Sequence, residues 1–532
     1  MERHDAIIIG GGLNGLTAAA YLARSGARVL LLERNAALGG ADASYEIVPG
    51  FTIPRYSLGT STLPARIVSE LDLARHGLRF LRVDGGVSLL EDGGYIASYR
   101  DGAIHRRELA RHSLKDADGW TRFRRDMLRG AQQLRPLLAG ATGDPTRRSF
   151  STLRRLLKTA SRWGEKDVGE LHDLTRLWTL SCADFLDDYF RSDAVKARLA
   201  SDALAGTSLG PRAPTGARHL LGAFIDETAG ASGGAPARVL AIGGPAAIAR
   251  ALGAAVEAHG GMIRTEAEVT DVLLREGGAR GVVLANGEEI QASAILSDLD
   301  LKRTFLALFP WSALPDGFVE RVGRFRMRGV SAKINIALDS APEFQAVPEG
   351  CPALLGGMRL ATTLDKMDRA SDDWRDGIPP RAPLIDMLVP TLADPTLAPH
   401  GRHVLSVAVH YVPETLHDGV WTGERRDELT DLVVERIAEA SPGIRDRIVA
   451  LETLTPPDIE SEVGITGGDL SHGETTLDQM FFNRPSPALA GYETPIRNLY
   501  LCSQSVHPGP LGVGNAGANA AALVASFLGK RG

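Results

Sequence analysis

Cysteine is scarce in this chain. Among 532 residues there are three, Cys182, Cys351 and Cys502, and none forms a C-x-x-C pair with another. The absence of that pair excludes a dithiol redox motif of this kind, and three widely spaced thiols argue against a disulfide framework. We therefore expect a protein of a reducing compartment, with Cys502 as a buried thiol in an apolar strand.

Charge of one sign and long apolar runs are also lacking. The 59 Lys and Arg residues face 65 Asp and Glu residues, so the net charge of −6 gives no reason to expect nucleic acid. Glycines and Asn14 interrupt the apolar run from Ala6 to Leu22, which we read as a strand and a helix instead of a membrane span. We expect no signal peptide, a cytoplasmic protein and no metal site, with a peripheral membrane contact left open.

Glycine, in contrast, is abundant near the N-terminus. The run Ala6–Ile9 predicts a buried strand, and G-x-G-x-x-G follows it at a strand-to-helix turn. Gly10 would permit the tight turn, Gly12 would let a pyrophosphate approach the backbone, and Gly15 would let the helix pack closely on the strand. This pattern predicts a dinucleotide-binding unit.

An acid completes that unit. A second apolar strand, Val29–Leu32, leads to Glu33, eighteen residues after Gly15. A carboxylate at this position accepts hydrogen bonds from ribose hydroxyls and favours an unphosphorylated ribose, although the adjacent Arg34 leaves NADP open. A glycine pair, Gly39-Gly40, follows the acid after five residues.

Two later blocks share this βα character. Between residues 239 and 298 we expect a helix from Gly243 to His259, a small β-meander with an Asn286-Gly287 hairpin, and then a separate apolar strand, Ala294–Leu296. Near the C-terminus, residues 498–502 predict a strand, 503–515 a glycine-rich loop and 516–528 a helix whose N-terminus could face an anion.

Long inserts separate these blocks. The simplest organisation is an α/β protein with a discontinuous Rossmann-like domain and an inserted substrate domain. Residues 115–230 are expected to be mainly helical, and strands are expected at 331–338 and 403–411 with a helix at 425–440. The expected boundaries are 1–75, 236–304 and 459–532 for the nucleotide-binding parts, 76–235 for a helical substrate or lid region, and 305–458 for the substrate domain.

With the three blocks placed, the chain resembles the phytoene desaturase-like flavoproteins, nearest to the branch called pyridine nucleotide-disulphide oxidoreductase domain-containing proteins. The segments that carry the resemblance are residues 5–40, PGFTIPRYS at 49–57, ELDLARHGLRF at 70–80, residues 243–269, SHGETTLDQMFFNRPSP at 471–487 and residues 498–521. The glycine pair after the acid belongs to the same resemblance, which implies FAD as the cofactor.

The resemblance also implies FAD contacts. Gly10, Gly12, Leu13, Asn14 and Gly15 would meet the pyrophosphate, Glu33 with Arg34 beside it the adenosine ribose, Gly40 and Ala41 the phosphates, and Val269 the adenine. The 503–515 loop, with Gln504, Gly512, Gly514 and Asn515, would close over the ribityl chain and flavin ring. Ser503-Gln504-Ser505 departs from the Gly-Asp or similar sequence of many relatives, which changes the local charge.

The function implied is an FAD-dependent oxidoreductase that takes hydride from a hydrophobic, isoprenoid-like or polyene-like substrate and passes electrons to oxygen, a quinone or another acceptor. His507 is the candidate proton acceptor, and its structural alternative is a residue that braces the loop before Pro508. Arg55, Tyr56 and His472 are as readily structural. The alternatives left open are a flavin-dependent polyene isomerase and a non-redox lipid-binding or escort protein of the same fold.

Residues 147–163 form one further segment of interest. Their apolar residues follow helical spacing and six Arg or Lys residues supply a basic side. Such a helix could touch an anionic membrane or present a solvated face, and we favour the solvated face.

Overall fold

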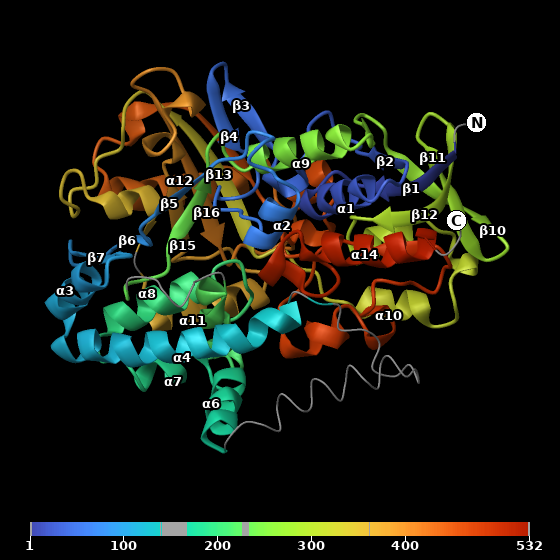
Figure 1. Cartoon of the computed structure of the whole chain (residues 1–532). Helices are drawn as coiled ribbons and strands as arrows, with labels where there is room; N and C mark the ends of the chain where they lie inside the picture. The colour runs from blue at the N-terminus through green and yellow to red at the C-terminus, as the bar shows by residue number, and fades with distance from the viewer. Residues whose placement is uncertain (1–2, 139, 141–167, 226–232, 361, 530–532) are drawn as a thin grey trace.

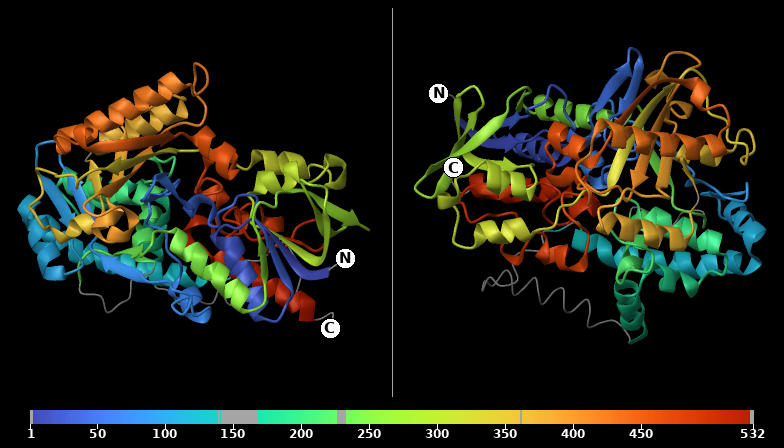
Figure 2. Two further views of the ribbon diagram at one scale, coloured as in Figure 1. Left: turned by 90° about the horizontal axis from the view of Figure 1, so that it is seen from above. Right: turned by 180° about the vertical axis from the view of Figure 1, so that it is seen from behind.

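The computed structural model describes residues 3–138, 140, 168–225, 233–360 and 362–529. The basic segment 147–163 lies outside this part of the chain. The two chain termini lie at one end of the molecule, beside the N-terminal sheet, and the second sheet lies at the other end (Figure 1, Figure 2).

The first sheet has seven strands drawn from three separate parts of the chain. The order is β10-β11-β12-β1-β2-β9, with β18 also paired to β12. The strands are β1 (Arg3–Ile9), β2 (Val29–Leu32), β9 (Met262–Arg264), β10 (Val269–Arg275), β11 (Gly278–Leu284), β12 (Glu289–Ser297) and β18 (Leu499–Leu501). The predicted α/β class with a discontinuous Rossmann-like domain is confirmed.

Strand β12 joins two predicted segments, the strand-like run at 289–295 that ends the meander and the apolar strand at 294–296. Residues 289–297 form one strand that pairs antiparallel with β11 over its first part and parallel with β1 and β18 beyond it. No glycine or proline interrupts this segment, so the strand continues from the hairpin into the buried sheet. The hairpin itself is confirmed at Asn286-Gly287, where Gly287 has φ +83°.

Three helices pack on this sheet: α1 (Leu13–Arg24), α9 (Ala246–Ala258) and α14 (Asn515–Gly529). Helices α1 and α14 lie so close together that a Cβ on Gly517 would overlap the Asn14 carbonyl oxygen. The two ends of the sequence therefore meet over the same strands (Figure 1).

The second sheet, also of seven strands, has the order β17-β13-β16-β15-β14-β6-β7. Its strands are β17 (Ile448–Leu454), β13 (Ser331–Leu338), β16 (His403–His410), β15 (Leu384–Leu388), β14 (Met358–Leu360), β6 (Gly86–Leu89) and β7 (Tyr95–Ser98). Strands β13 and β16 and the helix α12 (Gly423–Ala440) were predicted. Strands β6 and β7 were not, because each is only four residues long and neither stands out in an apolar pattern.

The two faces of this sheet differ in polarity. In β13, Ile334 and Ile336 lie in an apolar cluster with Val433 and Ile437 of α12. Since side chains alternate along a strand, Ser331, Lys333 and Asn335 point to the opposite face. This polar face meets the segment that follows β4, where Asn335 donates to the Arg55 carbonyl oxygen at 2.9 Å.

A helical layer lies next to the polar face of the second sheet (Figure 1). It consists of α4 (Leu114–Leu138), α6 (Val168–Thr179), α7 (Cys182–Asp187) and α8 (Asp193–Leu204). Its core is apolar and aromatic, with Phe123 in ring contact with Phe190 and Phe224. The helical character predicted for 115–230 is confirmed within the described residues.

The remaining regular elements connect these layers. They are β3 (Ser44–Val48), β4 (Phe51–Pro54), α2 (Ala65–Glu70), β5 (Phe80–Val83), α3 (Gly102–His112), β8 (Arg238–Ala241), α10 (Phe318–Arg324), α11 (Leu364–Arg375) and α13 (Pro456–Val463).

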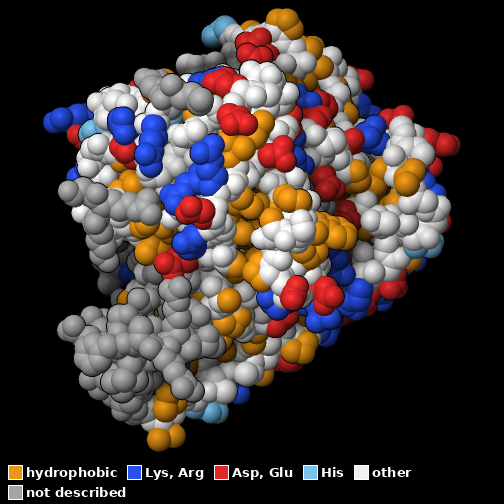
Figure 3. Space-filling model, turned by 90° about the vertical axis from the view of Figure 1, so that its right-hand side faces the viewer, with side chains coloured by type: hydrophobic (Ala, Val, Ile, Leu, Met, Phe, Trp, Pro, Cys, Tyr) orange, Lys and Arg blue, Asp and Glu red, His pale blue; other side chains and the backbone are white. Residues whose placement is uncertain are grey.

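Basic and acidic side chains are interspersed over the face seen in Figure 3. Within the described ranges, no helix combines the length and the apolar character that crossing a membrane requires.

Candidate active site

The glycine-rich turn joins β1 to α1. Gly10 has φ +101°, a conformation that L-residues with a side chain rarely adopt. A Cβ on Gly15 would overlap the Gly10 carbonyl oxygen, so only glycine lets the first turn of α1 approach the strand end. The conformational roles expected of these two glycines are met, and their contact with FAD stays a prediction.

Glu33 follows β2 and faces this turn. Its side chain is buried, and its two carboxylate oxygens accept hydrogen bonds from the backbone N–H of Gly11 at 2.7 Å and of Asn35 at 2.9 Å. The Arg34 guanidinium is engaged by another segment of the chain, because it donates to the Glu462 carbonyl oxygen at 2.6 Å. An arginine held in this way does not favour a 2′-phosphate, which supports FAD over NADP at this position.

Asp298, at the end of β12, is an acid of this site that the sequence reasoning missed. The carboxylate accepts hydrogen bonds from the backbone N–H groups of Gly12 and Gly15, and burial raises its pKa well above the usual value, with Glu33 adding to the shift. In this structure the N–H groups of Gly12 and Gly15 are thus directed at Asp298. A polar residue directly after a buried strand was the available signal.

The other predicted FAD residues gather around the same turn. Gly514 donates its N–H to Asn14 Oδ1 at 2.8 Å, which ties the C-terminal loop to the start of α1. Gly39 donates to the Gly11 carbonyl oxygen at 2.8 Å, and this places the Gly40-Ala41 turn against the same loop.

Five further predicted residues can be placed. Val269 begins β10, two residues after Ala267, whose N–H donates to the Glu33 carbonyl oxygen at 2.9 Å. The Gln504 carbonyl oxygen accepts a 2.9 Å hydrogen bond from Arg484. Leu13 and Asn515 begin α1 and α14, and Gly512 lies so close to Asn515 that a Cβ there would contact its side-chain amide.

These observations test the fit of FAD to the chain. The glycines of the turn leave the backbone open to close approach at the start of α1, Glu33 places a carboxylate beside it, and the buried Nδ1 of His472 has no partner among the described residues. The His472 carbonyl oxygen accepts from Ser505, so this histidine lies beside the loop that follows β18. The residues present fit a bound dinucleotide.

His507, the predicted proton acceptor, is almost fully buried. Its Nε2 donates to the Leu137 carbonyl oxygen at 2.7 Å, and burial lowers its pKa to about 4. The ring also lies 5.9 Å from that of Phe481. His507 is thus a neutral histidine anchored to α4, and its catalytic role stays a prediction.

A cavity of about 320 Å³ lies between the loop after β4, the segment Gly468–Ser471 and the polar face of the second sheet. Tyr56 lines it and donates to Glu462 at 2.7 Å, while Arg55 is held by Glu452 and Glu462 at 3.0 and 2.9 Å. Of the two residues weighed from the sequence, Tyr56 therefore faces the cavity and Arg55 is part of an ion-pair network.

Lys333, on the polar face of β13, is a buried amine. Its Nζ donates to Ser406 Oγ at 2.8 Å and to Asn335 Oδ1, and burial lowers its pKa to about 7. Sequence reasoning missed this residue. The signal was the alternation Ser-Ala-Lys-Ile-Asn-Ile, which places every polar side chain of the strand on one face.

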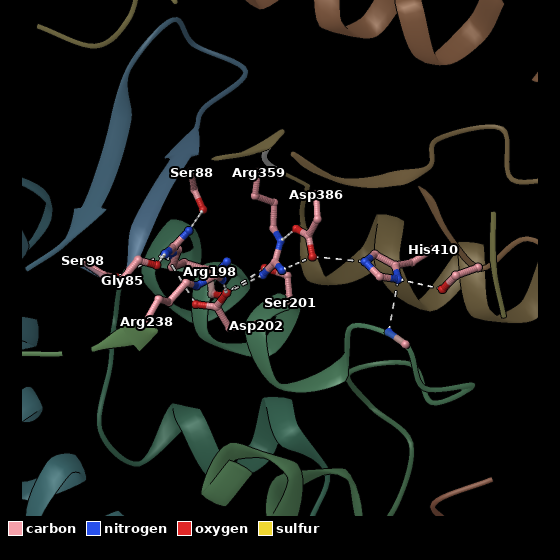
Figure 4. Close-up of polar contacts among 12 residues, drawn as sticks. Gly85, Ser88, Ser98, Arg198, Ser201, Asp202, Arg238, Arg359, Asp386 and His410 are labelled. Carbon is pink, nitrogen blue, oxygen red and sulfur yellow. Dashed lines mark hydrogen bonds and ion pairs between the residues drawn. The ribbon is translucent and has the colours of Figure 1, made fainter. Parts of the chain in front are cut away.

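A cluster of charged residues lies where the helical layer meets the polar face of the second sheet (Figure 4). We call it the arginine cluster, and its members are Arg198, Asp202, Arg238, Arg359, Asp386 and His410. Arg359 is the centre, with its guanidinium paired to Asp386 and, at 2.9 Å, to Asp202. Burial would raise the pKa of Asp386, but Arg359 and His410 outweigh it and hold the pKa well below its usual value.

Comparison with known proteins identifies the family. Residues 8–70 match the family described as an NAD(P)-binding Rossmann-like domain. The mouse protein called pyridine nucleotide-disulfide oxidoreductase domain-containing protein 2 is 35% identical over 548 residues, which cover 98% of this chain and 93% of the mouse protein. The chain belongs to this oxidoreductase family. Membership and the intact dinucleotide-binding segment bear out the predictions of an enzyme and of FAD as its cofactor.

More distant proteins share the whole length. Prolycopene isomerase 1 of an Oncidium hybrid cultivar is 25% identical over 554 residues, covering 99% of this chain and 85% of the isomerase. A solved oxidoreductase from Methanosarcina mazei superposes with a TM-score of 0.56 at 18% identity, covering 99% of this chain and all of that one. The second likeness concerns the fold alone.

The family name mentions disulfides, but the thiols of this chain are free. Cys182 and Cys502 are buried, and burial raises the pKa of both thiols. A thiol with a raised pKa supplies little thiolate at neutral pH, so neither is suited to thiol–disulfide exchange. Thiol–disulfide exchange by Cys182 or Cys502 is therefore not supported, whatever the family name suggests.

Proposed function

We propose that this oxidoreductase is an FAD-dependent dehydrogenase that takes hydride from a C–H bond of a small molecule held in the 320 Å³ cavity. The observation that carries the proposal is the position of this cavity, between the polar face of the second sheet and loops of the nucleotide-binding part. FAD, when bound, supplies the hydride acceptor. The chain supplies the cofactor site and positions the substrate.

The cavity lining narrows the substrate. Leu58, Val330, Ile459 and Leu470 give it apolar walls, while members of the arginine cluster face the same space. A pure hydrocarbon would displace water from the partly exposed Arg238 and Asp202 without replacing its hydrogen bonds, at a cost in free energy. The proposed substrate therefore keeps the predicted hydrophobic body and adds one polar end.

A polyene isomerase is the second candidate. The likeness to prolycopene isomerase 1 along nearly the whole chain favours it. An isomerase would convert its substrate without net electron transfer, whereas a dehydrogenase reduces one FAD for each substrate oxidised.

The two candidates are separated by anaerobic mixing of the FAD-loaded protein with hydrophobic substrates that carry a polar group. The proposal expects the visible flavin absorbance to bleach in proportion to product formed, and to return when oxygen or a quinone is added as the electron acceptor. An isomerised product with unreduced flavin would favour the second candidate. A substrate that is oxidised just as fast by protein stripped of FAD would contradict both.

A further inference from the structure

The arginine cluster is unusual because its charges do not balance. Three guanidinium groups, of Arg198, Arg238 and Arg359, contact two carboxylates, of Asp202 and Asp386. Arg359 and Arg198 have side chains only 4% exposed, so these charges are held away from water. Buried charges are normally paired, and among the residues that the structure describes this cluster has one positive charge in excess.

His410 does not change this balance. The Gly206 N–H donates to His410 Nδ1 at 3.2 Å, so Nδ1 carries a lone pair. The proton then lies on Nε2, which donates to Asp386 at 3.1 Å. His410 is the neutral tautomer, and Ser331 Oγ, 3.0 Å from Nδ1, is able to donate to it as well.

Other charged groups along the cavity wall have partners of their own. Asp469 accepts hydrogen bonds from the backbone N–H groups of Ser471 and Gly473 and lies near Arg484, although burial outweighs these partners and raises its pKa to about 7. Arg55, behind Tyr56, is paired with Glu452 and Glu462. The uncompensated positive charge therefore belongs to the arginine cluster.

Arg238 is the member of the cluster that is free to meet a ligand. The terminal nitrogens of Arg198 donate to Ser88 Oγ, Ser98 Oγ and the Gly85 carbonyl oxygen. Arg359 contacts both carboxylates and Ser201. Within the described residues, Arg238 makes one 3.1 Å contact, from a single nitrogen to Asp202; it also lines the cavity and keeps 27% of its side chain exposed.

We infer that the cavity binds a substrate with a single carboxylate group, and that this group pairs with Arg238. The planar fork of an arginine matches the two oxygens of a carboxylate. A monoanion neutralises the one excess charge, whereas a phosphate carries about −1.5 to −2 at neutral pH and would overshoot it. The inference rests on the proposed function, since it takes this cavity as the substrate site.

The test measures binding of benzoate and of its neutral isostere benzamide to the FAD-loaded full chain by isothermal titration calorimetry. Benzoate is expected to saturate one site, and benzamide and inorganic phosphate to bind at least about tenfold more weakly. Benzamide or phosphate binding as tightly as benzoate would overturn the assignment of a carboxylate.

Variants assign the site to the cluster. Arg238→Gln is expected to weaken benzoate binding about tenfold or more. Arg238→Lys keeps the charge without the planar fork, so its affinity for benzoate should lie between those of the wild type and Arg238→Gln. Arg107→Gln, which removes the same charge from exposed helix α3, is the matched control and should leave binding unchanged. Unchanged binding in Arg238→Gln would overturn the inference.

Asp202→Asn provides a test of opposite sign. Removing one carboxylate enlarges the excess of positive charge, so benzoate is expected to bind several-fold more tightly, provided that thermal unfolding shows a folded variant. Weaker binding in a folded Asp202→Asn protein would contradict the charge argument.

Failure of this inference is distinguishable from failure of the proposed function. If substrates reduce the flavin without any preference for a carboxylate, only this inference is contradicted. If the protein binds benzoate but no substrate reduces its flavin, the proposed function is contradicted.

Discussion

The two halves of the candidate site are built in opposite ways. The dinucleotide turn uses backbone N–H groups and glycines that lie within a few residues of one another, between β1 and α1. The arginine cluster uses charged side chains from α8, β8, β14, β15 and β16, which span residues 198–410. The first half depends on local backbone shape, and the second on which strands become neighbours.

Sensitivity to substitution is expected to differ accordingly. In the turn, a Cβ on Gly15 would meet the Gly10 carbonyl oxygen, a backbone atom that cannot move aside as the end of a flexible side chain can. In the arginine cluster, the balance of charge matters more than side-chain volume. The loss of a positive charge can therefore be offset by the loss of a negative charge.

The largest effect is expected for Gly15→Ala. Alanine normally stabilises a helix by about 1 kcal/mol relative to glycine, but here the new Cβ would overlap the Gly10 carbonyl oxygen and press on Asp298. We expect a loss of FAD binding and a destabilisation of about 1–3 kcal/mol. Flavin content after purification and denaturant unfolding measure the two effects.

Gly423→Ala is the matched control, because a Cβ at the first residue of α12 would meet no atom within 4 Å. It should retain FAD and full stability. Retention of FAD by Gly15→Ala at the wild-type level would show that the turn does not need a glycine at this position.

In the arginine cluster the expected effect on FAD binding is smaller than in the turn, and the expected loss of stability is greater. Arg359→Met would leave Asp386 and Asp202 without their shared partner, at a cost of about 3–5 kcal/mol in the free energy of unfolding. Flavin content should stay near that of the wild type, since Arg359 lies outside the dinucleotide turn.

The double variant Arg359→Met/Asp386→Leu removes both charges of the central pair and should recover part of that loss. Chemical denaturation of the three proteins closes a thermodynamic cycle. Additive losses in the double variant would contradict the idea that the two side chains act as one unit.

The smallest effect concerns Lys333 and pH. Burial lowers the pKa of this lysine to about 7 in the folded state, against an ordinary value of 10.5. Between these values the unfolded chain binds a proton that the folded chain does not, so stability rises with pH by up to about 1.4 kcal/mol for each pH unit. Below pH 7 the contribution is constant.

Lys333→Met should lack this rise, and the difference between the two unfolding profiles isolates the lysine from other groups that titrate in the same range. Parallel profiles for the wild type and the variant would mean that Lys333 is protonated in the folded protein at these pH values.

How much could be predicted from the sequence follows from the same contrast. The G-x-G-x-x-G turn, Glu33 and the three βα blocks were predictable because each is encoded within about thirty residues. Strands β6 and β7 were missed because four residues carry too little pattern. Asp386 was missed because it is the single polar residue of β15, and His410 because it lies at the end of β16, and only the pairing of the two strands brings them together.

Asp298 lies between these cases. It follows a predicted strand directly, yet its importance depends on the parallel pairing of β12 with β1, which sets its carboxylate on the glycine turn. Rules that read one strand at a time do not contain this information. A rule that collects polar residues at the carboxyl ends of neighbouring parallel strands would have found it.

The measurement that tests the account most directly is the amount of flavin released by heat from the purified chain, identified by chromatography, for the wild type and Gly15→Ala. The account predicts about one FAD per wild-type chain and little or none in the variant. A colourless wild-type protein that takes up no added FAD would contradict it.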